Sequence, residues 1–321
     1  MKLRIGHLST FYHTAILLMA GGKADARLGL EIEWRLMGTG PAIMQAFQRG
    51  DLDLAYIGLP PAMIGMDRGA PVICVAGGHM EGTVMAGKPE WKGFPEETEL
   101  RALLQQFAGK RIGVPGRGSI HDVILRNAIE GCGLEPEIEV VNYAWADMVT
   151  EAVVRDEVAA AVGTPALAAA IRRFAGGKML FPPSRLWPHN PSYGIVAHQG
   201  LLEKKAEVAE GFLRLHEETT AYLRAQPREA AKTIAEFIGI VDQDLVLDAL
   251  RISPKYCAHL TEEYVAATMQ FVPVLRKLGY IKSEIDKDRI FYRAIIDRIH
   301  PERDHYGDGI ESAEFGVRSA E

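Results

Sequence analysis

Hydrophobic and polar positions follow two alternating rhythms over the first two-thirds of the chain. Short, largely apolar runs predict strands, and runs whose apolar residues recur every three or four positions predict helices. Continuous apolar strands separated by helices are typical of a parallel sheet covered on both faces. The predicted elements are strand 2–8, helix 13–20, strand 30–37, helix 41–50, strand 52–58, helix 61–69 and strand 71–77.

The segment 87–99 interrupts this rhythm, because it is polar and holds two prolines and two glycines. The alternation restarts at Arg111 and resembles the beginning of the chain. Three short matches carry the resemblance: RIG at 4–6 and 111–113, EIEW and EIEV at 31–34 and 137–140, and IGLP and VGTP at 57–60 and 162–165. Their nearly constant spacing of about 105 residues predicts two α/β units built on one plan.

Helical periodicity dominates after about residue 200. Proline near the start and glycine at the end of one of these segments fit helix boundaries. The predicted helices cover 201–226, 227–239, 243–252, 261–279 and 286–299, and a polar tail follows at 307–321.

The glycine-rich stretch GKRIGVPGRGSIHDVIL at 109–125 raises the question of nucleotide binding. A P-loop requires lysine where this chain has Ser119, and the dinucleotide pattern requires glycine where it has His121. The residues do begin a helix, whose free N–H groups and dipole suit an anion. Simple helix capping by Ser119 explains the same pattern, so both interpretations stay open.

Composition narrows the class of protein. The 321 residues are 48% hydrophobic and 24% charged, which is ordinary for two globular domains. A formal charge of −6 without a basic run argues against nucleic acid as a partner. The three cysteines, Cys74, Cys132 and Cys257, are far apart, which favours reduced, buried thiols. The early apolar run at 15–20 is too short for a membrane span and lacks the order of a secretory signal.

Three segments together resemble a known family. They are GKRIGVPGRGSIHDVILRNAIEGCGL from Gly109, GDLDLAYIGLPPAM from Gly50, and the run that begins SYGIVAHQGLLEKK at Ser192. They are similar to periplasmic binding proteins of type 2, in the nitrate, sulfonate and taurine (NMT1/THI5-like) branch. The likeness extends over about residues 1–282.

This resemblance implies an α/β fold with two lobes, each a mostly parallel sheet flanked by helices, and a helical C-terminal region. Lobe 1 would comprise residues 1–85 and 191–321, and lobe 2 residues 86–190. The ligand would lie between lobes that close as hinged bodies. Ligands of open α/β sheets bind beyond the carboxyl ends of the strands, which agrees with this placement.

Strand ends and crossing segments therefore supply the candidate site. Hydroxyls, amides, aromatic rings and free N–H groups gather there, as in small-molecule clefts. The candidate ligand-binding residues are Ser9, Thr10, Phe11, Tyr12, His13, Thr39, Pro60, His79, Ser119, Ile120, His121, Tyr143, Thr164, His189, Asn190 and Tyr193.

Five histidines fall in these loops, namely His7, His13, His79, His121 and His189. They could bind a metal, donate hydrogen bonds to an anionic ligand, or be ordinary loop residues. Because no pair has a recurrent metal-binding spacing, we expect no metal ligand among them and no cofactor. We expect at least one of them to contact the ligand.

The FYHT segment also resembles the pyrimidine-precursor synthases of thiamine biosynthesis, which share the fold. Their lysine would fall on Ile57 and their histidine on Pro61, and no cysteine cluster is present. The sequence also lacks G-x-S-x-G and H-E-x-x-H motifs. We therefore expect no enzyme of that chemistry and no catalytic residues.

The leading hypothesis is a solute-binding protein that captures a small anionic or aromatic molecule of the sulfonate, nitrate, taurine or pyrimidine class. Its protein partner would be an ABC permease. We expect the chain to be a monomer that binds no nucleic acid and has no membrane span of its own. The alternatives are a cytoplasmic enzyme of thiamine-precursor or menaquinone-pathway type and a ligand sensor. An extracytoplasmic location (periplasm or cell surface) follows if a signal preceded the chain, and a cytoplasmic one if Met1 is the native start.

Overall fold

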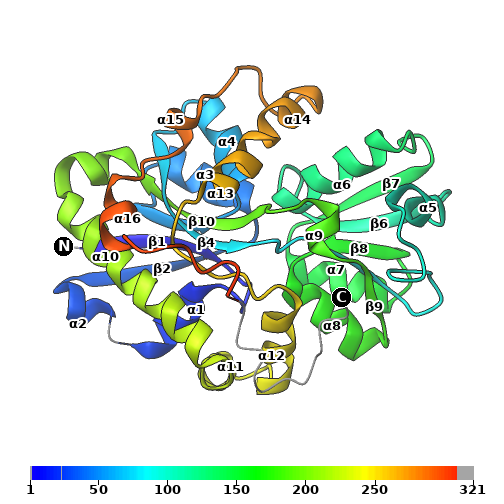
Figure 1. Cartoon of the computed structure of the whole chain (residues 1–321), viewed down its shortest axis with the longest axis horizontal. Coiled ribbons are helices and arrows are strands. Elements are labelled where there is room, and N and C mark those ends of the chain that lie inside the picture. Colours follow the sequence, from blue (N-terminus) through cyan, green and yellow to red (C-terminus); the bar gives the residue numbers. More distant parts are fainter. Residues whose placement is uncertain (1, 23, 309–321) are drawn as a thin grey trace.

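Two five-stranded sheets form the centres of two halves that lie side by side in this computed structural model (Figure 1). The structure describes residues 2–22 and 24–308. The first sheet consists of β1 (Lys2–Leu8), β2 (Glu31–Met37), β3 (Leu54–Ile57), β4 (Val72–Met80) and β10 (Pro191–His198), in the order β2-β1-β3-β10-β4. The second consists of β5 (Val84–Gly87), β6 (Lys110–Pro115), β7 (Ile138–Tyr143), β8 (Ala160–Gly163) and β9 (Lys178–Phe181), in the order β7-β6-β8-β5-β9.

One strand in each sheet runs against the other four. In the first sheet β1 pairs in parallel with β2 and β3, whereas β10 is antiparallel to β3 and β4. In the second sheet β6 pairs in parallel with β7 and β8, whereas β5 is antiparallel to β8 and β9. The reversed strands are the two that follow the crossings of the chain between the sheets. This is the two-lobed, mostly parallel α/β fold that the sequence predicts.

Strand register confirms the internal repeat. Ile5 of β1 faces Trp34 of β2, and Ile112 of β6 faces Val140 of β7 in the same way. The sequence offsets of these pairs, 107 and 106 residues, are those of the RIG and EIEW matches. The two halves therefore share strand order and register as well as sequence pattern.

Helices cover the faces of both sheets. The first half holds α1 (Thr14–Gly21), α2 (Ala24–Leu28), α3 (Gly40–Gln48) and α4 (Leu59–Asp67). The second holds α5 (Leu100–Gln105), α6 (Ile120–Gly131), α7 (Ala146–Val154), α8 (Pro165–Ala175) and α9 (Pro183–Leu186). Strands β3, β5 and β8 are buried along their full length, which explains their continuous apolar sequences.

The C-terminal region is helical, as predicted, but more interrupted. It contains α10 (Gln199–Ala225), α11 (Pro227–Ile238), α12 (Gln243–Ile252), α13 (Glu262–Met269), α14 (Phe271–Lys277), α15 (Lys287–Ile290) and α16 (Ala294–Ile299). The predicted helix 261–279 divides at Gln270, because Pro273 lacks an N–H and crowds the carbonyl of the preceding turn. The predicted helix 286–299 divides at Phe291, which forms a bridge with Cys74 of β4.

The two halves are also linked outside the crossing strands. Helix α12 packs against both α11 and α8, although α8 belongs to the second sheet. Because β5 lies in the second sheet, we propose that lobe 2 begins at Val84 rather than residue 86. Among the described residues, no helix combines the length and apolarity needed to cross a bilayer. Most of the predicted polar tail lies outside the described residues.

Candidate functional site

A cavity lies between the two sheets, where the carboxyl ends of β1, β2, β3, β6 and β8 meet. The cavity is narrow: the centre of a water-sized sphere can reach about 40 Å³ of it, within about 530 Å³ of empty space that includes the opening to solvent. The lining residues are Leu8, Ser9, Thr10, Tyr12, His13, Gly38, Thr39, Gly40, Gly58, Pro61, Pro115, Ser119, Ile120, His121, Ala146, Thr164 and Ser192. The structure thus places the cavity where the sheet rule predicts it.

Five helices begin at this cavity. Their N-cap residues all line it: His13 of α1, Thr39 of α3, Gly58 of α4, Ser119 of α6 and Thr164 of α8. Each strand leads directly into the helix that follows it, so the repeat directs every helix start to the same gap. The free N–H groups and positive dipole ends of these helices favour negative charge there.

Three hydroxyls at the helix starts have defined roles. The oxygens of Thr39, Ser119 and Thr164 accept hydrogen bonds from backbone N–H groups of their own helices, at 3.4, 3.3 and 3.1 Å. Ser119 Oγ also donates to the Pro115 carbonyl at 3.4 Å. Since capping uses the oxygen as an acceptor, the hydroxyl hydrogens of the two threonines remain as donors for a ligand. Ser119 therefore caps its helix, and anion binding beside it stays a prediction.

Among the described residues, the lining of the cavity includes no lysine, arginine, aspartate or glutamate, so its wall carries no charged side chain. The groups on the wall that favour an anion are therefore the oriented backbone dipoles at the helix starts. Such dipoles keep their direction without side-chain motion, so little reorganisation is needed when an anion enters. An uncharged wall of this kind suits a singly charged anion better than a strongly hydrated multivalent one.

Two polar atoms on the wall have no hydrogen-bond partner within residues 2–22 and 24–308. They are Thr10 Oγ1 and His13 Nδ1, and both side chains are buried, with exposures of 5% and 2%. A buried polar group without a partner costs about 1–3 kcal/mol, so a ligand that bonds to these atoms gains affinity. Thr10 Oγ1 and His13 Nδ1 are therefore candidate contact atoms for a ligand in the cavity.

The cavity histidines are neutral. Burial, followed by the nearby His79, lowers the pKa of His13 well below its ordinary value. Burial lowers the pKa of His121 to about 3, and its Nδ1 lies 3.0 Å from Thr83 Oγ1. Neutral imidazole can still donate one hydrogen bond to an anion.

The structure brings nine of the sixteen predicted residues to the cavity wall, namely Ser9, Thr10, Tyr12, His13, Thr39, Ser119, Ile120, His121 and Thr164. Phe11 lines a smaller adjoining cavity instead. Pro60 is buried in α4, and Tyr143 is half-buried at the end of β7. These three residues do not reach the main cavity.

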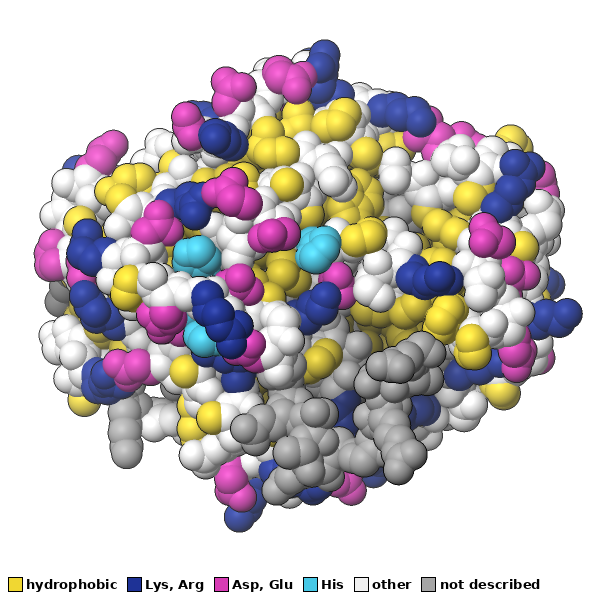
Figure 2. Space-filling model, viewed as in Figure 1, with side chains coloured by type: hydrophobic (Ala, Val, Ile, Leu, Met, Phe, Trp, Pro, Cys, Tyr) yellow, Lys and Arg dark blue, Asp and Glu magenta, His cyan; other side chains and the backbone are white. Residues whose placement is uncertain are grey.

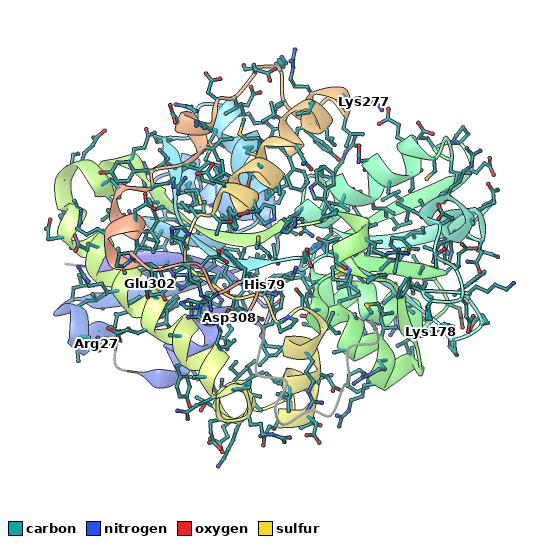
Figure 3. The ribbon with its side chains drawn as sticks, viewed as in Figure 1. Arg27, His79, Lys178, Lys277, Glu302 and Asp308 are labelled. Carbon is teal, nitrogen blue, oxygen red and sulfur yellow. The ribbon has the colours of Figure 1, made fainter. Side chains whose placement is uncertain are left out.

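The remaining four predicted residues do not line the cavity either. His79 is fully buried at the centre of the molecule (Figure 3), and its Nε2 lies 2.6 Å from the Ser253 carbonyl. Tyr193 is also fully buried and bonds to Thr14. His189 is exposed, and the side chain of Asn190 donates to the Trp187 carbonyl at 3.0 Å.

Ser192 is the polar wall residue that the sequence analysis missed. It lies between two predicted residues on β10, and its Oγ is 3.0 Å from the hydroxyl of Tyr12. Side chains alternate along a strand, so Ser192 faces the cavity while Tyr193 faces the core. Alternation along 191–198 was the signal that could have identified it.

The two halves touch each other around the cavity. A Cβ at Gly38 would lie 2.8 Å from the carbonyl oxygen of Ala144, and one at Gly116 would lie 2.7 Å from Thr39 Cγ2. The hydroxyl of Tyr280, in the C-terminal region, donates a hydrogen bond of 2.5 Å to Asp122 Oδ2 of α6. The structure therefore shows the halves closed upon each other.

Sequence and structure comparisons agree with this architecture. The sequence profile of the NMT1-like family matches residues 1–239. A candidate binding protein of Brucella abortus (strain 2308) is 23% identical over 253 residues, which is 78% of this chain and 75% of that protein.

Solved structures with the same fold include several binding proteins. The ligand-binding component of an ABC-type import system from Staphylococcus aureus, solved with zinc bound, has a TM-score of 0.76 at 15% identity, covering 94% of this chain and 99% of that one. The periplasmic aliphatic sulphonate binding protein of Escherichia coli has a TM-score of 0.73 at 18% identity, covering 91% and 92%. The periplasmic nitrate-binding protein of Synechocystis PCC 6803 has a TM-score of 0.73 at 13% identity, covering 97% and 91%. With the profile match over most of its length, the chain belongs to the NMT1-like family.

Proposed function

We propose that the protein is a solute-binding protein that captures a small anionic organic molecule between its lobes and delivers it to an ABC-type importer outside the cytoplasm. The observation that carries this proposal is the convergence of five helix N-termini on a cavity without charged side chains. The sulfonate- and nitrate-binding proteins with the same fold support the ligand class, and the family supports the transport role.

The wall chemistry divides the cavity into two parts. Hydroxyls and N–H groups at the helix starts would bind the anionic group, whether sulfonate or carboxylate. The apolar surface of Leu8, Pro61 and Ile120 would contact the organic part of the ligand. Tyr12 is the aromatic wall residue and offers the edge or face of one ring. A monoanion with a short organic tail fits this arrangement better than inorganic nitrate, which has no apolar part.

Enzymatic alternatives find little support in the cavity. The hydroxyl–imidazole pair nearest to catalytic geometry is Thr83 with His121. Thr83 is fully buried and does not line the cavity, and a pKa of about 3 makes His121 a poor base at neutral pH. Among the described residues, the group of side chains arranged to hold a metal lies elsewhere in the molecule.

A thermal-shift screen tests the proposal. Protein freed of co-purifying ligands by unfolding and refolding would be screened against alkanesulfonates, taurine, aromatic carboxylates, nitrate and pyrimidines. Each anion would be paired with a neutral isostere, such as a sulfonamide or carboxamide. A true ligand at 100 times its Kd stabilises the fold by about 2.7 kcal/mol. We expect anions to raise the Tm and their neutral isosteres to leave it unchanged; equal shifts, or no shift by any compound, would refute the proposal.

A further inference from the structure

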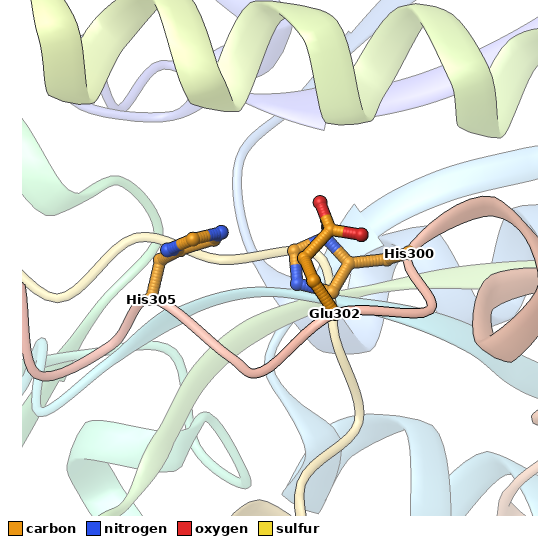
Figure 4. Close-up of side chains that lie close together, drawn as sticks. All are labelled: His300, Glu302 and His305. Carbon is orange, nitrogen blue, oxygen red and sulfur yellow. Dashed lines mark ion pairs between the residues drawn. The ribbon is translucent and has the colours of Figure 1, made fainter.

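A cluster of histidine and carboxylate side chains lies after α16, in a segment that the proposed function does not use. The ligand atoms of His300, Glu302 and His305 all lie within 4.8 Å of one another (Figure 4). Glu302 lies beside α10 and α16 (Figure 3), and none of the three residues is among those that line the cavity. Histidine, acidic and basic side chains are mixed on this face of the molecule (Figure 2).

Each histidine of the cluster has at least one ring nitrogen held by the protein. His305 Nδ1 lies 2.7 Å from Asp308 Oδ2, and His300 Nε2 lies 3.0 Å from the Arg303 carbonyl oxygen. This arrangement leaves His305 Nε2 as a ligand atom, whereas His300 Nδ1 is hydrogen-bonded to Glu217 Oε1 at 3.0 Å and would exchange that bond and its proton for a metal ion. Histidines that bind metals usually have their second nitrogen fixed in this way by a carboxylate or a backbone carbonyl.

Two carboxylates face Nδ1 of His300. Its Nδ1 is 3.8 Å from Glu302 Oε1 and 3.0 Å from Glu217 Oε1. Two ligands bound to one tetrahedral zinc ion at about 2.0–2.2 Å lie roughly 3.3–3.5 Å apart. The distance of 3.8 Å between His300 Nδ1 and Glu302 Oε1 is within a few tenths of an ångström of this range.

Residues around the cluster fix the backbone of its loop and include one carboxylate oxygen without a hydrogen-bond partner. The buried sulfur of Cys257 accepts hydrogen bonds from the backbone N–H groups of His259 and His305, at 3.5 and 3.4 Å. Glu217 Oε2 is buried and has no hydrogen-bond partner, so a bound cation would compensate it. The Glu302 side chain is 57% exposed, which gives an ion access from solvent and lets the side chain rotate inward.

We propose that His300, Glu302 and His305 bind one divalent transition-metal ion, with Zn²⁺ as the best chemical match. Two imidazoles and a carboxylate form a donor set that suits zinc, and Glu217 is close enough to complete the shell. Glu217 belongs to α10, so the ion would fasten the C-terminal segment to the first half. The site is separate from the cavity and does not depend on the proposed transport function.

Zinc binding to the untagged, full-length, chelator-treated protein tests this site. The probe is Zn²⁺ alone, titrated in competition with a chromophoric chelator. We expect one ion per chain with micromolar or tighter affinity. Glu302→Gln and His305→Ala should each weaken binding roughly 100-fold or more, and the exposed His189→Asn should leave it unchanged. Asp308→Asn, which keeps the size of the residue but loosens His305, should weaken binding by about 10–100-fold.

Two further readouts keep the test decisive. Substitution by Co²⁺ should give the visible absorption of a four-coordinate nitrogen and oxygen site, and this absorption should be lost in Glu302→Gln. Thermal melting without metal should be nearly equal for the wild type and Glu302→Gln, because that side chain is exposed. Absence of stoichiometric zinc binding by the wild type, or equal binding by the wild type and both ligand variants, would overturn the proposal.

Discussion

At the scale of single residues, the sequence located the cavity wall but not the direction of every side chain. Residues in the turns after strands, such as Thr10, His13 and Thr39, reach the wall because the backbone there must turn toward the gap. His79 and Tyr193 lie on strands, where neighbouring side chains point to opposite faces. Their direction depends on the strand register, which a histidine or tyrosine in the sequence does not reveal.

Ser119 offers a test of the charge that the cavity prefers. Aspartate and asparagine both cap helices well, so Ser119→Asp and Ser119→Asn should fold alike. Ser119→Asp places a carboxylate at the anion position, and we expect it to weaken ligand binding at least roughly tenfold more than the isosteric Ser119→Asn. Isothermal titration calorimetry measures both affinities. Tighter anion binding by the aspartate variant would contradict an anion site beside α6.

Neutral histidines predict a flat pH dependence of ligand binding. Because the folded pKa of His121 is about 3, this residue gains no proton between pH 5 and 8, and burial likewise lowers the pKa of His13 well below its ordinary value. The Kd of a strong-acid ligand such as a sulfonate should therefore stay constant over this range. An affinity that rises steeply as the pH falls through 6.5 would show that a protonated histidine holds the anion.

At the scale of elements, hydrophobic periodicity predicted the strand–helix units well, and the repeat matched the strand register. Strands β5 and β9 are only four residues long, and such short runs give little periodic signal. The division of the predicted helix at 261–279 follows from Pro273, a residue visible in the sequence. The cluster of His300, Glu302 and His305 lies within six residues of sequence but escaped prediction because the spacing of its histidines is not a recurrent metal-binding pattern, and Glu217 approaches it from a distant helix.

Closure of the halves over the ligand depends on small residues at their contact. A Cβ at Gly38 would lie 2.8 Å from the Ala144 carbonyl oxygen and 3.2 Å from the Trp145 ring. Gly38→Ala should therefore disfavour closure and weaken ligand binding roughly tenfold, with little change in the Tm of the ligand-free protein. Gly131→Ala is the matched control, because a Cβ there meets nothing within 4 Å. Equal ligand affinities of the two variants would argue against closure at this contact.

At the scale of the whole molecule, stability and binding share one architecture. Buried polar groups link the core to the site: His216 Nδ1 lies 3.2 Å from both Thr14 Oγ1 and the Tyr56 hydroxyl, and its Nε2 lies 3.0 Å from the Gly77 carbonyl. Thr14 is the first residue of α1, whose N-cap His13 forms part of the cavity wall. The same network that fills the first half therefore fixes a helix start at the ligand site.

Buried neutral histidines predict acid sensitivity of the fold. Burial lowers the pKa values of His79, His121 and His216 to about 3, 3 and 4. Below about pH 6.5 the unfolded chain binds protons that the folded chain excludes, so stability is lost as the pH falls from 6.5 toward these values. Each histidine contributes about 1.4 kcal/mol per pH unit to the slope. Chemical unfolding at pH 7, 6 and 5 measures it, and a constant free energy of unfolding would contradict their burial.

His300 has the opposite effect on the pH dependence of stability, because its stabilising contribution is lost as the pH rises above neutrality. Burial alone would lower its pKa, but contacts with Cys257 and Glu217 outweigh burial and raise the pKa to about 10. Its folded-state proton therefore stabilises the metal-free protein fully below about pH 6.5, and this contribution declines as the pH rises toward 10. Stability of the metal-free protein should consequently be greatest near pH 6.5–7.

The central claim is tested most directly by calorimetric titration of the refolded protein. The two compounds to titrate are the organic anion that gives the largest thermal shift and its neutral isostere. One anion should bind per chain, with a negative heat-capacity change from burial between the lobes, and the neutral isostere should bind at least roughly 100-fold more weakly. Equal affinity for the two compounds would contradict the claim that helix N-termini hold an anion between two closing halves. The same holds if the Ser119→Asp variant binds the anion as tightly as the wild type does.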